Sequence, residues 1–312
     1  MEVSSCYNKC KSIGEETILS IKLEYDITAY QESLYSLSQL TNQNEREIEE
    51  YIILNLQDYS ANHYLEEFNI DERSLLEKDL WLTSLHVTTN NDDCASLKKY
   101  GLMDIQKAIS LVTQFYQYLK QFGITFDLVQ KKFTHKNKTY DLSKKFNAFS
   151  TDDKEQQLET LERKLYKDNQ INGFYSYDNM LTYGGYVNRR PEFLCNLAEF
   201  LDIPNLLYDW ERNNKCYVIK FIAPISEYTD WNFMNSWEID SLDDEEIEIK
   251  KRKWMMNVTL SNIIDGFFHQ SIRENYSYLR PNVIIPYSNF TELYTDDEYL
   301  KAYGYERSKK YQ

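Results

Sequence analysis

The stretch SLHVTTNNDDCASLKKYGLMDIQKAI, from Ser84 to Ile109, decides the fold class that the sequence predicts. It continues an apolar, β-branched run that starts at Leu80, which is typical of a buried strand. The residues NNDD (90–93) predict a polar turn or helix cap, and CASLKKYG predicts a helix that ends at Gly101, where a C-cap glycine belongs. One of the 4 histidines, His86, therefore lies near the end of a strand and next to two threonines.

Upstream of this stretch the chain reads as helical. NEREIEEYIILNLQDY begins with Asn44 as a helix cap and has Glu47 three residues later, which is the pattern of a capping box. Downstream, helical and strand patterns alternate at irregular spacing, and this favours an α+β fold over a doubly wound sheet. We expect a helical N-terminal region over 1–78 and an α+β domain over 79–312.

The downstream elements can be assigned from their periodicity. MDIQKAISLVTQFYQYLKQFG predicts one amphipathic helix that ends at Gly123. ITFDLVQKKFTHKNKTYDLS alternates and predicts a hairpin with HKNK as its turn. DDKEQQLETLERKLYK and RPEFLCNLAEFLD predict helices, whereas INGFYSY, CYVIKFIA and the late segment RPNVIIPYSNF predict strands.

Composition limits the function classes. The formal net charge of −15 argues against general tight binding to a nucleic-acid backbone, although it leaves room for a local basic groove. The five cysteines are odd in number, and the Cys6–Cys10 pair has no second pair to complete a zinc site, so we expect free thiols. The sequence has no secretion signal and no apolar run of membrane-spanning length, which predicts a cytoplasmic protein without membrane contact.

A family resemblance rests on about 20 residues. His86-Val87-Thr88-Thr89, the polar turn and the helix that ends in Gly101-Leu102 resemble the first motif of ADP-ribosyltransferases. The similarity is to the diphtheria-toxin and poly(ADP-ribose)-polymerase type, and DarT-like bacterial toxins open in a similar way. It implies a split β-sheet core with surrounding helices, and NAD as the substrate.

The resemblance also implies roles for particular residues. His86 would hold the adenosine-side ribose and the nicotinamide amide, with Thr88 and Gly101 beside it. A tyrosine would stack on the nicotinamide ring, and we favour Tyr183, because Gly184-Gly185 allows close approach of a ligand. The remaining candidates for the NAD site are Tyr175 on the strand, Arg190 together with Arg189 for the pyrophosphate, and Asn282.

The third motif of the family departs from the pattern. Asn282 stands in the late segment where the family has a glutamate, and Glu292 is the nearest downstream carboxylate. Loss of nicotinamide leaves an oxocarbenium-like ribose, which a nearby anion stabilises. We therefore predict that Glu292 is the catalytic carboxylate, and that His86 and Tyr183 complete the catalytic group without a metal.

The function implied is transfer of ADP-ribose to a macromolecular acceptor, which could be RNA, DNA or protein. A bacterial toxin or an anti-phage defence effector would fit this activity, with a neutralising antitoxin as a further partner. An enzyme is favoured over a binding protein.

Two alternatives stay open. In the segment DDEEIEIKKRK, Asp243 or Asp244 with Glu248-x-Lys250 on a strand would form the Mg²⁺ site of a nuclease. A non-catalytic interaction protein would also suit an acidic, aromatic-rich chain. Against this acidic background the predicted hairpin is basic, and it is the best candidate for contacting a nucleic acid: Lys131, Lys132, Lys136, Lys138, Lys144 and Lys145.

Overall fold

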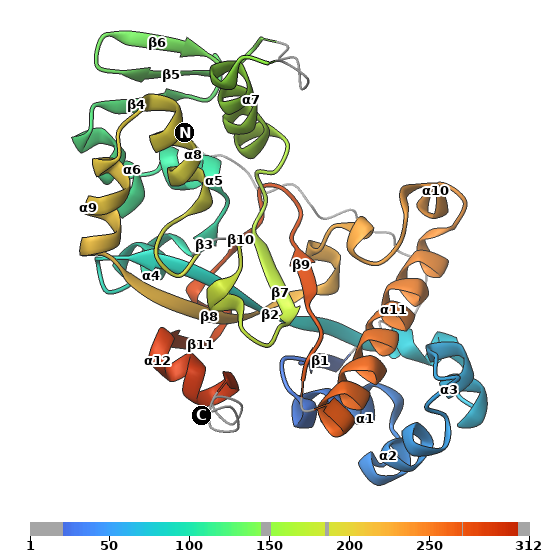
Figure 1. Ribbon diagram of the computed structural model, residues 1–312. Coiled ribbons are helices and arrows are strands. Elements are labelled where there is room, and N and C mark those ends of the chain that lie inside the picture. Colours follow the sequence, from blue (N-terminus) through green and yellow to red (C-terminus); the bar gives the residue numbers. More distant parts are fainter. Residues whose placement is uncertain (1–20, 145–150, 185–186, 270, 305–312) are drawn as a thin grey trace, which may run out of the picture.

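A computed structural model describes residues 21–144, 151–184, 187–269 and 271–304. The chain forms a mixed α+β structure around a six-stranded sheet (Figure 1). Cys6, Cys10, Lys145 and Gly185, which the sequence analysis names, lie outside the described residues.

The central strand is β2 (Lys78–Asn90), which contains the predicted strand around His86. All neighbours of β2 in the sheet are antiparallel except β1 (Ile21–Tyr25), which runs parallel to its first residues. The spatial order is β11-β8-β2-β7-β9. The bounds of the other strands are β7 (Asn172–Ser176), β8 (Lys215–Pro224), β9 (Asn275–Tyr278) and β11 (Phe290–Thr295).

The N-terminal helices cover the first half of β2. Asn44 begins its helix with the predicted capping box, in which its side chain accepts a hydrogen bond from the Arg46 backbone. Strand β1 was not expected in this region. The helices pack with α11 (Asp244–Ile264) against the sheet in one hydrophobic cluster, so the core continues across residues 78–79. The bounds are α1 (Tyr30–Thr41), α2 (Glu45–Leu54) and α3 (Ala61–Glu67).

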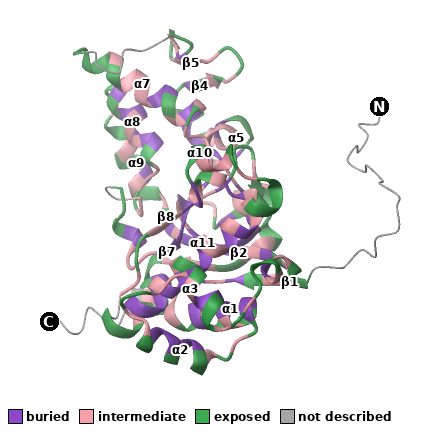
Figure 2. Ribbon diagram, turned by 90° about the vertical axis from the view of Figure 1, so that its right-hand side faces the viewer, coloured by how far each residue is buried: buried purple, intermediate pink, exposed green. Residues whose placement is uncertain are grey.

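A second hydrophobic cluster lies at the opposite end of the molecule, and the two ends give the molecule an elongated outline (Figure 2). Except for α4 (Ala95–Tyr100), whose Leu97 packs on the first cluster, it joins the helices between β2 and β8 to a three-stranded sheet. The bounds of the others are α5 (Ile105–Ser110), α6 (Gln114–Gln121), α7 (Asp153–Tyr166), α8 (Glu192–Leu201), α9 (Asn205–Asn213), β4 (Ile124–Asp127), β5 (Lys132–His135) and β6 (Lys138–Asp141).

Two predicted elements of this lobe differ from the structure. The helix expected over 103–123 is divided into α5 and α6. The Thr113 side chain accepts a hydrogen bond from the Tyr116 backbone and donates one to Ala108 O at 2.6 Å, so it starts a new helix. The predicted hairpin has the expected turn between β5 and β6, but β4 extends it to three strands.

The late segment also differs from the prediction of one strand over 280–290. Before Phe290, only Ile284 and Ile285 of this segment form a strand, β10, which pairs with β3 (Leu102–Met103) directly after α4. The next strand, β11, begins at Phe290, followed by α12 (Asp296–Tyr299). The short helix α10 (Ser236–Ile239) precedes α11. Among the described residues, no helix is long and apolar enough to cross a membrane.

Candidate functional site

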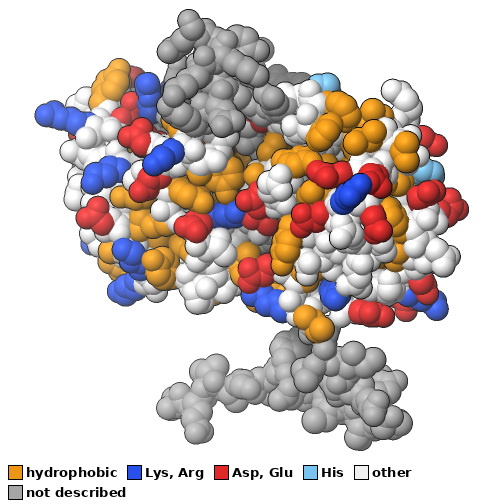
Figure 3. Space-filling view, turned by 90° about the horizontal axis from the view of Figure 1, so that it is seen from below, with side chains coloured by type: hydrophobic (Ala, Val, Ile, Leu, Met, Phe, Trp, Pro, Cys, Tyr) orange, Lys and Arg blue, Asp and Glu red, His pale blue; other side chains and the backbone are white. Residues whose placement is uncertain are grey.

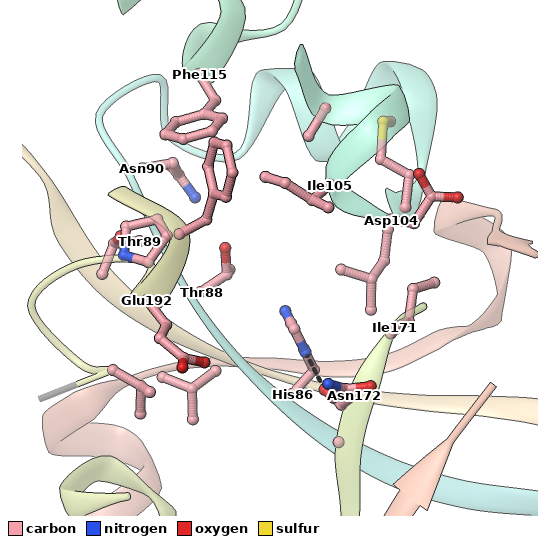
Figure 4. A pocket seen from close by; sticks show the side chains of 18 of the residues that line it. His86, Thr88, Thr89, Asn90, Asp104, Ile105, Phe115, Ile171, Asn172 and Glu192 are labelled. Carbon is pink, nitrogen blue, oxygen red and sulfur yellow. Dashed lines mark hydrogen bonds between the residues drawn. The ribbon is translucent and has the colours of Figure 1, made fainter. Parts of the chain in front are cut away.

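The main sheet opens at His86. Strand β2 pairs with β8 continuously from Trp81 to Asn90, but its ladder with β7 consists of the single pair Leu85–Phe174. Beyond this pair a cavity of about 470 Å³ lies between the two strands and the helices above them (Figure 4). Its volume is within the range of small-molecule sites. Its walls come from residues 86–90 of β2, residues 170–174, and helices α5 and α8.

His86 faces this cavity as a neutral ring. Its Nδ1 lies 2.7 Å from the carbonyl oxygen of Asn172 on β7. Because a carbonyl oxygen only accepts, Nδ1 carries the proton and Nε2 is the free acceptor. Burial lowers the pKa of His86, more than the bond to the Asn172 carbonyl raises it. Figure 4 shows the other ring nitrogen directed into the cavity, where it can accept a hydrogen bond from a ligand.

The two threonines after His86, Thr88 and Thr89, differ in their contacts. Thr89 Oγ1 accepts a hydrogen bond of 2.9 Å from Trp210 Nε1 and is buried. Thr88 lines the cavity, and its hydroxyl forms no hydrogen bond with any residue that the structure describes. Thr88 is therefore the hydroxyl available to a ligand, whereas Thr89 fixes α9 against the strand.

Gly101 ends α4 as predicted and contributes backbone to the cavity wall. Its φ is +80°, and a Cβ at this position would lie 2.4 Å from the carbonyl oxygen of Ile285. Glycine is required here because β10 passes directly against it. Asp92 from the predicted polar turn accepts hydrogen bonds from the backbone and hydroxyl of Ser96, at 2.9 and 2.5 Å.

Of the two candidate tyrosines, one lines the cavity. Tyr183 lies at its rim, and its ring is 5.1 Å from that of Phe174 and 5.8 Å from that of Tyr276. Tyr175 points to the side of β7 opposite to that of the cavity-lining Phe174, because successive residues of a strand face alternate sides. It is fully buried 5.4 Å from Tyr228, and burial raises its pKa well above the ordinary value. The structure thus places Tyr175 in the core and outside the cavity.

Arg190 lines the cavity but is also bonded within the protein. Its Nε donates to Cys195 Sγ at 2.7 Å, and its Nη1 pairs with Glu211. A ligand phosphate at this position would share the guanidinium with Glu211. The role of Arg190 toward a pyrophosphate stays a prediction.

The structure does not bring Asn282 or Glu292 to the cavity. Asn282 has φ +70° in a turn, accepts a hydrogen bond of 3.2 Å from Lys107 Nζ, and borders a second opening beside Trp81. Glu292 is exposed on the edge strand β11, opposite Lys220 of β8. Two strands, β8 and β2, lie between β11 and the cavity side of the sheet.

Lys164, Asp168 and Glu192 are charged residues at the cavity that were not singled out from the sequence. Lys164 Nζ lies 2.7 Å from Asp168 Oδ2 and 2.8 Å from Glu192 Oε2. Burial alone would lower the pKa of Lys164, but the two carboxylates outweigh it and the pKa is raised. The i,i+4 spacing of Lys164 and Asp168 could have predicted an ion pair between them. The same spacing is common in exposed ion pairs on helix surfaces, so it does not by itself indicate a cavity.

Glu192 is the most accessible of these groups. It is the first residue of α8, and 55% of its side chain is exposed. Figure 4 shows it extending from the helix at the side of the cavity that also holds Thr88. A carboxylate is therefore present at the cavity, supplied by α8 instead of a late strand.

The end of the cavity away from His86 is aromatic. The Phe115 ring lies edge-on to Trp210, with 5.3 Å between centroids, and to Phe193, with 6.5 Å between centroids. All three line the cavity together with Ile105. The site thus has one polar end, at His86, and one apolar end that suits a planar ring.

The residues of the nuclease alternative lie elsewhere. Asp243 caps α11, and Glu248 and Lys250 are within that helix, so the prediction of a strand is wrong. Glu248 pairs with Lys251 at 2.9 Å and with Arg252 at 2.6 Å. Across the part of the chain that the structure describes, no three His, Cys, Asp or Glu side chains form a group that could hold a metal.

No protein-family model matches the chain, and neither a curated protein nor a solved structure is significantly similar to it.

Proposed function

We propose that this protein binds NAD in the His86 cavity and transfers ADP-ribose to a macromolecular acceptor. One observation carries the proposal. The sheet parts directly after Leu85, so that the motif residues His86 and Thr88 line one cavity together with Gly101. An ADP-ribosyltransferase first motif needs this arrangement, and a histidine that served only the core would not need it.

The hydrogen-bonding groups suit the proposed ligand. His86 Nε2 can accept from a ribose hydroxyl or from the carboxamide of nicotinamide, and the Thr88 hydroxyl can donate or accept beside it. The aromatic end around Phe115 and Trp210 suits a planar ring, and Arg190 suits the pyrophosphate. Tyr183 at the rim suits stacking on a second ring.

Glu192 is our choice for the catalytic carboxylate, in place of Glu292. In the reaction the bond between nicotinamide and ribose C1′ breaks, and its electron pair leaves with neutral nicotinamide. A nucleophile of the acceptor then bonds to C1′ and releases its proton to water. The ribose passes through an oxocarbenium-like state, and an ionised carboxylate next to it lowers the barrier. Glu192 lines the cavity, whereas Glu292 does not.

The test is turnover of radiolabelled NAD in cell extract, with the products separated into protein, DNA and RNA fractions. Glu192→Gln should lower labelling and NAD cleavage about 100-fold, because it removes transition-state stabilisation. The affinity for NAD should change little, because the lost interaction acts mainly in the transition state. Glu292→Gln is the matched comparison and should retain activity. Full activity of Glu192→Gln with loss in Glu292→Gln would contradict this assignment, and NAD left intact by the wild type would contradict the proposed reaction.

A further inference from the structure

A chain of polar contacts joins His86 to Glu192 at the cavity. His86 Nδ1 donates to the backbone oxygen of Asn172 at 2.7 Å, and the side-chain amide of Asn172 donates to Asp168 Oδ1 at 3.3 Å. Lys164 Nζ then bridges the carboxylates of Asp168 and Glu192, at 2.7 and 2.8 Å. All five residues line the cavity. The two ends of the chain are the two polar residues assigned to NAD, and Lys164 is the contact that brings in the second.

Lys164 differs from the charged residues of the surface. Figure 3 shows charged side chains of both signs spread over one face of the protein. Exposed pairs such as Arg46–Glu50, with side chains 84% and 58% exposed, contribute little to stability. Lys164 is only 16% exposed and has two carboxylate partners. Burial opposes its charge, but the two carboxylates outweigh burial and raise its pKa, so Lys164 is an ammonium at neutral pH.

The backbone that carries Lys164 is fixed in place, whereas the side chain of Glu192 is not. Lys164 belongs to the last turn of α7, and Gln106 Nε2 of α5 donates to the next carbonyl, Leu165 O, at 2.6 Å. Leu165 is fully buried in the second hydrophobic cluster. Glu192 is 55% exposed, and an exposed glutamate has several rotamers open to it. Within the described ranges Lys164 is its ion-pair partner, so Lys164 decides where this carboxylate lies.

Asp168 balances the charge of Lys164. Two carboxylates share one ammonium, so the group of three carries a net charge of −1. A lysine paired with Glu192 alone would form a neutral pair, which would do less to stabilise a developing positive charge on a ribose. With Asp168 present, Glu192 can be held by a cation without being neutralised.

We propose that Lys164 is the positioning residue for Glu192 and that Asp168 is its charge partner. This inference rests on the proposed function, because that function gives Glu192 its role in the transfer of ADP-ribose. Lys164 directs the carboxylate of Glu192 to the cavity, and Asp168 preserves the negative charge of the group. Neither residue takes part in breaking or forming a bond.

The surroundings of the group allow its pH dependence to be interpreted. Among the described residues, the nearby charged or titratable groups from α7, β2, α9, β9 and the adjoining loops are Arg163, His86, Arg190, Glu211, Glu274 and Tyr278. Tyr278 stays neutral, because burial raises its pKa. His86, whose pKa burial lowers, is the same in every variant below, as are the arginines and glutamates. Differences between the variants therefore report on Lys164, Asp168 and Glu192.

The first test separates kcat from KM for cleavage of radiolabelled NAD by the full chain, with desalted cell extract as the source of acceptor and extract alone as the blank. Lys164→Met should lower kcat about tenfold, because Glu192 is no longer held in place, and should leave KM within about twofold. Lys164→Arg keeps a cation that can bond both carboxylates and should stay within about threefold of wild type. Lys167→Met is the matched control, because Lys167 directly follows α7 and pairs with Glu162 at 2.9 Å away from the cavity lining.

The second test compares kcat at pH 5.5 with kcat at pH 7.5. A cation favours the charged form of a nearby carboxylate, and a second carboxylate opposes it. In Lys164→Met the two carboxylates repel each other without a shared cation, so the ratio of the two kcat values should fall at least about threefold below that of wild type. Adding Asp168→Asn to Lys164→Met removes the repulsion and should restore the ratio while kcat stays low. Asp168→Asn alone should lower kcat without lowering the ratio.

The outcomes separate this inference from the reaction on which it rests. Wild-type activity with an unchanged kcat in Lys164→Met, or with an equal loss in Lys167→Met, would overturn the role of Lys164 and leave the reaction standing. A ratio that stays low in the double variant would overturn the role of Asp168. NAD left intact by wild type would overturn the reaction and this inference with it. Circular dichroism checks the fold of each variant, and Lys164→Gln, which also removes the charge, replaces Lys164→Met if that variant does not fold.

Discussion

The two halves of β2 differ in what they contact. From Leu80 to Leu85 the strand is enclosed by its neighbours, and the buried Ser84 hydroxyl lies 2.9 Å from that of Tyr228. From His86 to Asn90 the strand keeps β8 on one side but faces a cavity on the other. One continuous strand therefore supplies core packing in its first half and available polar groups in its second. Substitutions in the two halves should affect different properties.

The largest effect on stability is expected in the first half. Leu82 is fully buried, so Leu82→Ala should lower the free energy of unfolding by about 3 kcal/mol, from lost burial and the cavity left behind. Urea unfolding followed by circular dichroism measures this. A loss below about 1 kcal/mol would mean that this half is less tightly packed than the structure indicates.

The next largest loss of stability is expected at Gly101, the glycine at the end of α4. Gly101→Ala adds a Cβ against the Ile285 carbonyl at a positive φ, and should cost about 2 kcal/mol. Gly184→Ala is the comparison. Its φ is +57°, but its Cβ would meet only Val187 Cγ1 at 3.4 Å, so about 1 kcal/mol is expected. Equal losses in the two variants would show that β10 does not pass close to Gly101.

In the second half of β2, Thr88 and Thr89 should differ in how much their substitution lowers stability. Thr89→Val leaves the buried Trp210 Nε1 without its acceptor and should cost about 1–2 kcal/mol. Thr88→Val should change stability by less than about 0.5 kcal/mol, because no described residue bonds its hydroxyl. NAD affinity should respond in the opposite order. A stability loss in Thr88→Val equal to that in Thr89→Val would remove the distinction between the two.

The sequence predicts the first half of β2 better than it predicts the cavity beside the second half. The apolar, β-branched pattern predicted the strand, and Gly101 predicted the end of α4, because both signals are local. The cavity wall was only partly predictable. Lys164 and Glu192 come into contact only because α7 packs against α8. Tyr175 was wrongly predicted to line the cavity, because the packing of the sheet decides which side of a strand faces the core. Glu292 was chosen by closeness in sequence to a late strand that the structure divides.

The smallest effect is the pH dependence from His86. Its pKa is lowered in the folded protein by burial, so the unfolded state takes up a proton at higher pH than the native state does. The stability that His86 contributes is fully present above its ordinary pKa of about 6.5 and is lost as pH falls from there through the lowered folded value. Urea unfolding between pH 8 and 5 should show this loss in the wild type and a smaller one in His86→Gln. Parallel pH profiles would contradict a buried neutral ring.

Calorimetric titration of NAD at pH 7.5 tests the central claim most directly, using wild type, His86→Gln and His135→Gln. His135 lies on β5, away from the lining of the cavity, and is the matched control. We predict that wild type and His135→Gln bind NAD equally, and that His86→Gln binds at least about tenfold more weakly, which corresponds to one lost hydrogen bond. Absence of binding by the wild type, or equal affinity of all three proteins, would contradict the assignment of the His86 cavity to NAD.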